Sequence, residues 1–216
     1  MKKRGEKLFH DKKRNFAFSL TLIIVVFIIV FIDFYSSIQK AYFVLILIAG
    51  LGSIWAFYIV DSVFSLGFKK RHYIFVAIIS FASLISAPMY YIWIYYDKVQ
   101  HFIFPMMLGS IVFFLISKLR LSLRWKLVFT FFTIMGTITI LEIFEYVFDH
   151  FFDLALQGVY LPDPAVPDQL KLVLSKIDDT MIDFILGVFG SLIYLSSLVT
   201  FFRRRLNSTP TSRENN

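Results

Sequence analysis

The segment Lys126–Asp149 reads KLVFTFFTIMGTITILEIFEYVFD and combines a long apolar run with acidic residues near one end. A run of about 18 or more mostly apolar residues is long enough to cross a bilayer as a helix. Glu142, Glu145 and Asp149 follow one another at steps of three and four, which predicts that they share one helical face. A charged side chain facing lipid costs about 2.5–3.5 kcal/mol, so this face is expected to contact other helices, water or a cation.

The rest of the chain is similarly apolar. Of its 216 residues, 58% are hydrophobic, and the mean hydropathy is +0.72, which excludes a soluble globular protein. The apolar runs predict an all-α, polytopic bundle of six transmembrane helices, at residues 16–34, 41–60, 73–96, 99–117, 126–148 and 180–202. They form one expected transmembrane domain, 16–202, between a basic tail (1–15) and a disordered tail (203–216). Cysteine is absent, which excludes disulfides and thiolate metal sites.

The positions of the basic residues predict an orientation in the membrane. With these helix bounds, all but four of the 22 lysines and arginines fall on one side; the four are Lys40, Lys98, Lys171 and Lys176. Basic residues concentrate on the cytoplasmic side, so both termini are predicted to be cytoplasmic, in a multi-pass protein of the cell (inner) membrane. The basic tails are interpreted as anchors on an anionic lipid surface, and nucleic-acid binding is not expected.

The longest polar interval, about residues 149–180, is predicted to be an external loop. Pro162, Pro164 and Pro167 interrupt any helix across its middle. After Asp168, a candidate N-cap, apolar residues recur with helical spacing at 170, 173, 174 and 177. This pattern predicts a short helix on the outer membrane surface, or alternatively a lid.

Ionisable residues gather at the external ends of the last three predicted helices. The fourth helix opens with Asp97, Lys98 and His101, the fifth closes with the acidic face of Glu142, Glu145 and Asp149, and the sixth opens with Asp178, Asp179 and Asp183. Small residues continue some of these faces and allow close packing: Gly109, Gly187, Gly190 and Ser191. We therefore expect a single pocket.

Carboxylates with one imidazole and no thiolate suit a divalent cation such as Mg²⁺, Mn²⁺, Ca²⁺, Zn²⁺ or Fe²⁺. The expected metal ligands are His101, Glu142, Glu145, Asp179 and Asp183, with Asp97 orienting His101. Asp97, Lys98, His101 and Glu142 are also candidate catalytic residues, although no reaction is indicated. Every arginine falls on the predicted cytoplasmic side, so only Lys98 or a metal would bind phosphate in this pocket.

Three functions stay open. The chain is a cation-binding protein that acts on or recognises a membrane or envelope substrate, a small ion- or proton-coupled transporter, or a non-catalytic scaffold or accessory protein. The lipid bilayer is the one expected partner, and the sequence names neither a substrate nor an oligomeric state. The carboxylates are ligands in the first case, proton relays in the second and packing contacts in the third.

The combined motifs resemble a known family. Asp97-Lys98-x-x-His101-Phe102, Glu142-x-x-Glu145 and Asp179-Thr180-x-x-Asp183, followed by Gly187 and Gly190, resemble the YjdF-like bacterial and archaeal membrane proteins. More distantly, they are similar to the VanZ-like proteins. The resemblance covers about residues 90–195 and implies a multi-pass inner-membrane protein, without implying a reaction. The proline-rich segment before Asp178 differs from the glycine-rich, tryptophan-containing segment of that family.

Overall fold

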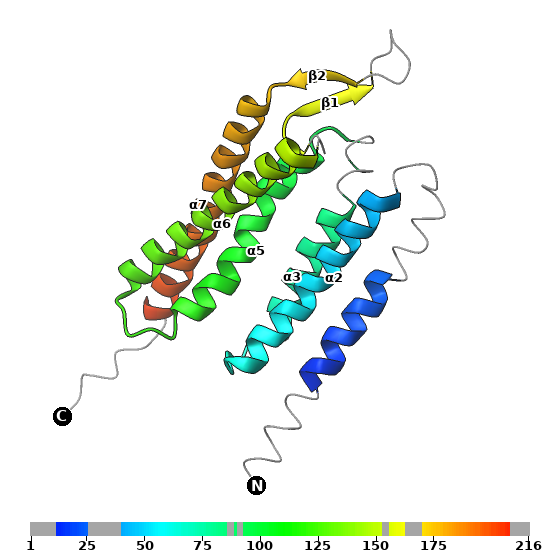
Figure 1. Ribbon diagram of the computed structural model, residues 1–216. Helices are drawn as coiled ribbons and strands as arrows, with labels where there is room; N and C mark the ends of the chain where they lie inside the picture. Colours follow the sequence, from blue (N-terminus) through cyan, green and yellow to red (C-terminus); the bar gives the residue numbers. More distant parts are fainter. Residues whose placement is uncertain are drawn as a thin grey trace, which may run out of the picture. The chain divides into compact units, whose positions relative to one another are not determined.

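The computed structural model describes residues 12–25, 40–85, 89, 93–152, 156–162 and 170–207. The chain divides into two compact units, Met1–Tyr96 and Asp97–Asn216. The regular structure in the described ranges is α-helical apart from one two-stranded antiparallel sheet (Figure 1). The predicted all-α class is therefore confirmed.

The described part of the first unit contains a helix at residues 12–25, α2 (Lys40–Val63) and α3 (Lys70–Leu84). Helices α2 and α3 pack against each other, and the hydroxyl groups of Ser53 and Ser80 form a hydrogen bond between them. Phe57 of α2 stacks on Phe68 at a ring-centroid distance of 4.4 Å. Aromatic packing thus closes the end of this helix pair.

A buried carboxylate joins the elements of the first unit. Asp61 accepts hydrogen bonds from the Lys13 ammonium at 2.5 Å and the Tyr73 hydroxyl at 2.5 Å. It also accepts the backbone amides of Gly67 and Phe68, at 2.8 and 3.2 Å. A buried carboxylate is tolerated when donors surround it, and Asp61 therefore anchors the turn between α2 and α3.

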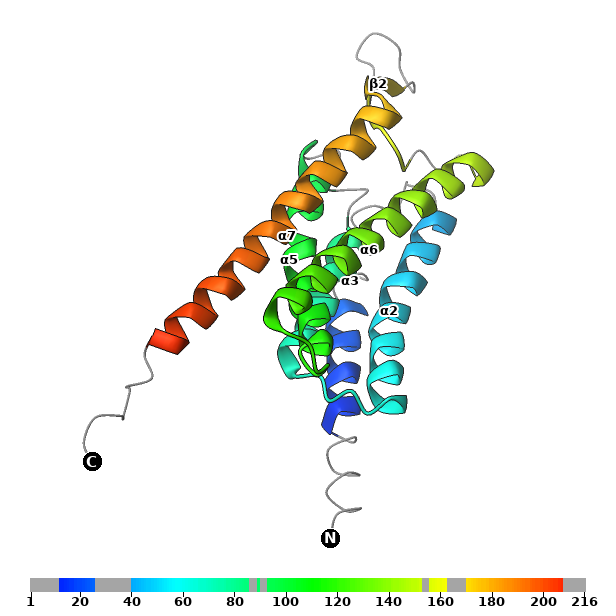
Figure 2. The ribbon, with the colours of Figure 1, turned by 90° about the vertical axis from the view of Figure 1, so that its left-hand side faces the viewer.

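The second unit contains α5 (Tyr96–Ile116), α6 (Leu123–Phe152) and α7 (Lys176–Asn207). Strands β1 (Val159–Pro162) and β2 (Leu170–Leu174) lie between α6 and α7 in the chain. The β-hairpin stands at the end of the unit where α6 ends and α7 begins, and α5 begins at the same end (Figures 1 and 2). The ionisable ends of the three helices are thereby brought together, as the predicted topology requires.

Membrane-spanning length is shown for three of the helices. Within the described ranges, Tyr96–Ile116, Leu123–Phe151 and Lys176–Arg205 are long and apolar enough to cross a membrane. The six spans predicted from the sequence are supported for these three. The first three spans stay a prediction, and part of the first, residues 26–34, lies outside the described residues.

The predicted surface helix after Asp168 is wrong. Residues Leu170–Leu174 form β2, which pairs with β1 in the register Val159↔Leu174 and Pro162↔Leu170. The sequence LKLVL places leucine at every second residue, so a strand fits it as well as a helix, and β1 supplies the pairing partner. Asp168 lies outside the described residues. Ser175 is the N-cap of α7 instead, because its hydroxyl oxygen accepts the Asp178 amide at 3.2 Å.

Glycine allows α7 to approach its two neighbours. A Cβ at Gly187 would lie 2.6 Å from the Ile138 side chain of α6, and a Cβ at Gly190 would overlap the Phe102 carbonyl oxygen of α5. Real side chains do not come this close, so a larger residue at Gly190 would force α7 away from the α5 backbone, whereas one at Gly187 would first displace the end of the Ile138 side chain. The close packing predicted from the small residues is confirmed at both positions.

We predict that Gly190→Ala destabilises the protein by about 1–3 kcal/mol, because the Phe102 carbonyl belongs to a helix backbone and yields little. Gly136→Ala is the matched control. No atom of the described residues lies within 4 Å of a Cβ at Gly136, so this change is expected to be neutral or to stabilise by up to about 1 kcal/mol. Thermal unfolding in one detergent measures both, and equal midpoints would contradict the prediction.

Candidate functional site

Lys98, in the first turn of α5, connects the starts of α5 and α7. Its ammonium nitrogen lies 2.6 Å from Asp179 Oδ1, 2.6 and 2.7 Å from the two oxygens of Asp183, and 3.2 Å from Asp97 Oδ2. The side chains of Asp179 and Asp183 are almost fully buried. Charges removed from water need close partners of opposite sign, so these contacts fix the position of α5 against α7.

His101, one turn further along α5, lies between two carboxylates. Its Nε2 is 3.4 Å from Asp97 Oδ1, and its Nδ1 is 3.7 Å from Glu142 Oε1 on α6. The predicted proximity of Asp97 to His101 is therefore confirmed. His101 links the α5 side of the cluster to the deepest carboxylate of the acidic face.

Glu142 has one oxygen with a hydrogen bond and one without. The Thr180 hydroxyl donates to Glu142 Oε2 at 3.0 Å, whereas the buried Oε1 has no hydrogen-bond partner within the described ranges. The residue is only 4% exposed. A buried carboxylate oxygen without a hydrogen bond is costly, so a further donor or a cation at Oε1 would be favourable.

Three residues of the cluster could together hold a cation. One ligand atom from each of Asp97, His101 and Asp183 lies within 4.8 Å of the others. Ligands about 2.0–2.2 Å from one ion are at most about 4.4 Å apart, so a small contraction would suffice. Asp97 and Asp183 also contact Lys98, so a cation here would share its ligands with the ammonium group.

The other two expected ligands differ from each other. Both oxygens of Asp179 are occupied, Oδ1 by Lys98 and Oδ2 by the Gly158 amide at 2.8 Å. Glu145 is partly buried and, in the part of the chain that the structure describes, forms no hydrogen bond or ion pair. The role of either residue as a metal ligand stays a prediction.

Aspartates also hold the segment between α6 and β1. Asp149 accepts the amide of Leu156 at 2.5 Å and that of Gln157 at 3.0 Å, and the Lys176 ammonium lies 2.9 Å from Asp149 Oδ2. Asp179 accepts the next amide, from Gly158, whose φ of +84° favours glycine. Sequence reasoning missed this role of Asp149, and Gly158 was the available signal.

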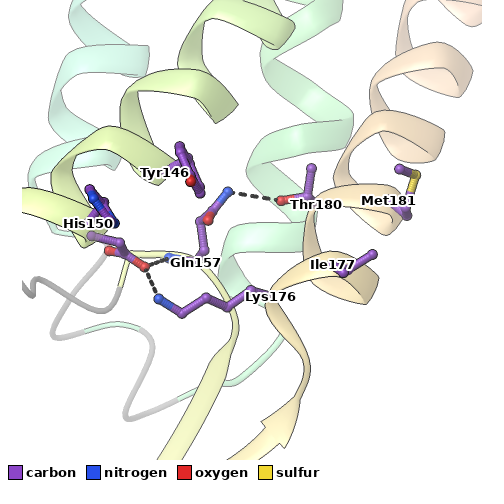
Figure 3. A pocket seen from close by; sticks show the side chains of 8 residues that line it. Tyr146, His150, Gln157, Lys176, Ile177, Thr180 and Met181 are labelled. Atoms are coloured by element: carbon purple, nitrogen blue, oxygen red, sulfur yellow. Dashed lines mark hydrogen bonds and ion pairs between the residues drawn. The ribbon is translucent and has the colours of Figure 1, made fainter.

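A cleft of about 470 Å³ adjoins the cluster. It is lined by Tyr146, Asp149, His150, Gln157, Lys176, Ile177, Thr180 and Met181 (Figure 3). The Gln157 side-chain amide donates to the Thr180 hydroxyl at 3.2 Å, and Thr180 donates in turn to Glu142. Two hydrogen bonds therefore connect the cleft to the buried carboxylate, a connection that sequence reasoning did not identify.

The helices and the polar cluster define a helical membrane protein with a buried ion-pair network at one end of three apolar helices. The chain belongs to the family described as predicted membrane protein (DUF2238), whose model matches residues 17–204. No curated protein and no solved structure matches the chain significantly. The resemblance to YjdF-like proteins agrees with this family, and the more distant similarity to VanZ-like proteins stays a prediction.

We predict that Lys98→Met destabilises the protein by about 3–5 kcal/mol, because it leaves buried carboxylates without their ammonium partner. Adding Asp183→Asn removes one uncompensated charge and is expected to restore part of the loss. Lys118→Met, at an exposed position beyond the other end of α5, is the control, with an expected loss of no more than about 1 kcal/mol from its contact with the Phe114 ring. Equal unfolding midpoints for Lys98→Met and Lys118→Met would contradict a central role for Lys98.

Proposed function

We propose that this protein is a multi-pass membrane protein that binds a divalent cation in the cluster at the ends of α5, α6 and α7. The cation would serve to recognise, or act on, a membrane or envelope substrate. The observation that carries the proposal is the buried Oε1 of Glu142, which accepts no hydrogen bond from the described residues and lies 3.7 Å from His101 Nδ1. It is supported by the Asp97, His101 and Asp183 group, whose ligand atoms lie within 4.8 Å of one another.

The charge balance of the cluster supports a cation. Five carboxylates (Asp97, Glu142, Glu145, Asp179 and Asp183) accompany one lysine and one histidine. A histidine that ligates a metal is neutral, so Lys98 would be the single resident positive charge. A divalent ion would reduce the excess of negative charge, which is costly to hold in a poorly hydrated site.

The donor types narrow the choice of ion. Mg²⁺ and Ca²⁺ take oxygen ligands, whereas an imidazole nitrogen together with carboxylates suits Zn²⁺, Mn²⁺ or Fe²⁺. The residues that would hold the ion are Asp97, His101 and Asp183, with Glu142 beside them. An ion held there would act as a Lewis acid that polarises an oxygen of the substrate.

A non-catalytic scaffold is the competing function, and the contacts of Lys98 favour it. Its ammonium group already has four carboxylate oxygens within 3.2 Å, an arrangement that fixes the helices without any metal. In that case the remaining carboxylates would hold protons in place of a cation. The amount of metal bound to the purified protein therefore distinguishes the two functions.

We propose further that the cluster faces the outside of the cell membrane, because the six predicted spans would put all but four of the basic residues on the opposite side. A reporter fused after Arg205 is expected to be cytoplasmic, and one fused at Asp163 is expected to be external. The reverse result would contradict the proposed orientation and leave the geometry of the cluster unaffected.

We predict that Glu142→Gln lowers the stoichiometry of bound metal and the gain in unfolding temperature on adding Mn²⁺ or Zn²⁺, because a ligand stabilises the state that binds it. Asp178→Asn is the matched control, since it removes one charge from an exposed residue in the first turn of α7, beside the cluster. Metal analysis of the purified variants makes the comparison. Unchanged metal content in Glu142→Gln, together with raised stability, would contradict cation binding and favour the scaffold.

A further inference from the structure

We propose that the cleft beside the cluster binds a membrane lipid through a phosphate-bearing head group. The cleft lies where α6 ends at Phe152 and α7 begins at Lys176, two helices of membrane-spanning length. Helix ends of this kind lie at the level of lipid head groups. The inference deepens the proposed function by naming a substrate class, and it rests on that function for the approach of the head group to a bound cation.

The apolar side of the cleft continues as a stripe along α7. Ile177 and Met181 line the cleft, and Ile185 and Phe189 follow at four-residue steps on the same helical face. All four side chains are exposed and apolar on a helix of membrane-spanning length, which suits contact with acyl chains. A ligand with a polar head in the cleft thus has a path for its hydrocarbon tail, and the volume of about 470 Å³ suits a head group.

The polar side of the cleft includes one exposed basic side chain, Lys176. In the ion pair between Asp149 and Lys176, the carboxylate side chain is 3% exposed and the ammonium side chain is 46% exposed. Both Asp149 oxygens are occupied by the Leu156 and Gln157 amides and by Lys176. The more exposed side chain of the pair is therefore the one that carries the ammonium group, and an ammonium group can bind a phosphate oxygen through a charge-assisted hydrogen bond.

His150 adds a second nitrogen-bearing side chain to the same side. Its ring stacks on Tyr146 at a centroid distance of 6.1 Å, and both residues are exposed on the last turns of α6 (Figure 3). Aromatic side chains with a polar edge are enriched at the level of head groups, where one end is apolar and the other is hydrated. The cleft therefore combines the features that a lipid head group requires.

The cleft also leads towards the candidate cation site. Gln157 reaches from the segment before β1 to Thr180 (Figure 3). The Thr180 hydroxyl donates in turn to Glu142. A head group bound against Gln157 lies two hydrogen bonds from the buried Glu142. Binding of the lipid and binding of the cation would thus occupy adjacent positions.

The test is a lipid titration of delipidated protein in detergent, with the unfolding midpoint as readout. Wild type, Met181→Trp and Ile193→Trp are titrated with dihexanoyl phosphatidylglycerol, dihexanoylglycerol or inorganic phosphate. Met181→Trp fills the cleft, whereas Ile193→Trp adds the same ring at an exposed position of α7 that does not line it. We expect the half-maximal concentration of phosphatidylglycerol to rise at least about tenfold in Met181→Trp and to stay within about twofold in Ile193→Trp.

The other ligands test the chemistry of the head group and its source. Dihexanoylglycerol, which lacks the phosphate, is expected to bind at least about tenfold more weakly than phosphatidylglycerol, and Lys176→Gln is expected to remove most of this difference. Inorganic phosphate at the same concentrations is expected to give no shift. If Met181→Trp and Ile193→Trp change phosphatidylglycerol binding equally, the cleft is not the binding site. If dihexanoylglycerol binds as tightly as phosphatidylglycerol, the phosphate is not recognised. If inorganic phosphate raises the unfolding midpoint as much as phosphatidylglycerol does, the ligand is phosphate and not a lipid.

Metal content measured in the same preparations separates this inference from the proposed function. Cleft-specific lipid binding in a wild type that holds no metal would contradict the cation and retain the lipid site. Bound metal without cleft-specific lipid binding would contradict the lipid site alone. If Met181→Trp fails to fold, Ile177→Trp at the same cleft provides the same comparison.

Discussion

An ammonium group inside a membrane protein has to be paired, and the contacts of Lys98 show how this chain meets that requirement. Lys98 approaches Asp183 and Asp179 within 2.7 Å, which fixes the first turn of α5 against the first two turns of α7. This distance is reachable because Gly190 lets α7 approach the backbone of α5 at Phe102. Gly190 and Lys98 therefore depend on each other, since a side chain at position 190 would separate the two helices that the Lys98 ion pairs join.

Asp179 also connects this helix packing to the β-hairpin. Asp179 uses one oxygen for Lys98 and the other for the Gly158 amide, so a change in the position of Lys98 acts directly on the segment that leads into β1. Asp149 holds the preceding residues of that segment through two amides and Lys176. The hairpin is thus attached to the helices by charged groups at its base, and the cleft forms between these attachments. Ion pairs in a poorly hydrated site are strong only when nearly all their partners are present, which couples the cluster, the hairpin and the cleft.

Part of this structure follows from the sequence and part does not. The sequence predicted that ionisable residues of α5, α6 and α7 lie together. Helical spacing shows which residues share a face of a helix, and the alternating direction of successive spans shows which helix ends lie on the same side of the membrane. The hairpin was not predictable, because LKLVL fits a helix and a strand equally well and only the pairing with Val159–Pro162 decides. The backbone-amide partners of Asp149 and Asp179 were also missed, since an amide has no signature in the sequence unless, as at Gly158, the backbone conformation favours glycine. Gln157 and Thr180 gain their role from the tertiary contact between the hairpin segment and α7.

Pulsed EPR of the protein loaded with one equivalent of Mn²⁺ tests most directly whether a cation binds beside His101. An imidazole ligand is expected to produce ¹⁴N modulation of the Mn²⁺ echo, and His101→Gln is expected to abolish that modulation. Asp178→Asn, at an exposed position of α7, should leave it unchanged. Nitrogen modulation in the wild type alongside its loss in His101→Gln is the result that cation binding in this cluster predicts. Mn²⁺ with oxygen ligands alone, and the same spectrum in all three proteins, would contradict it.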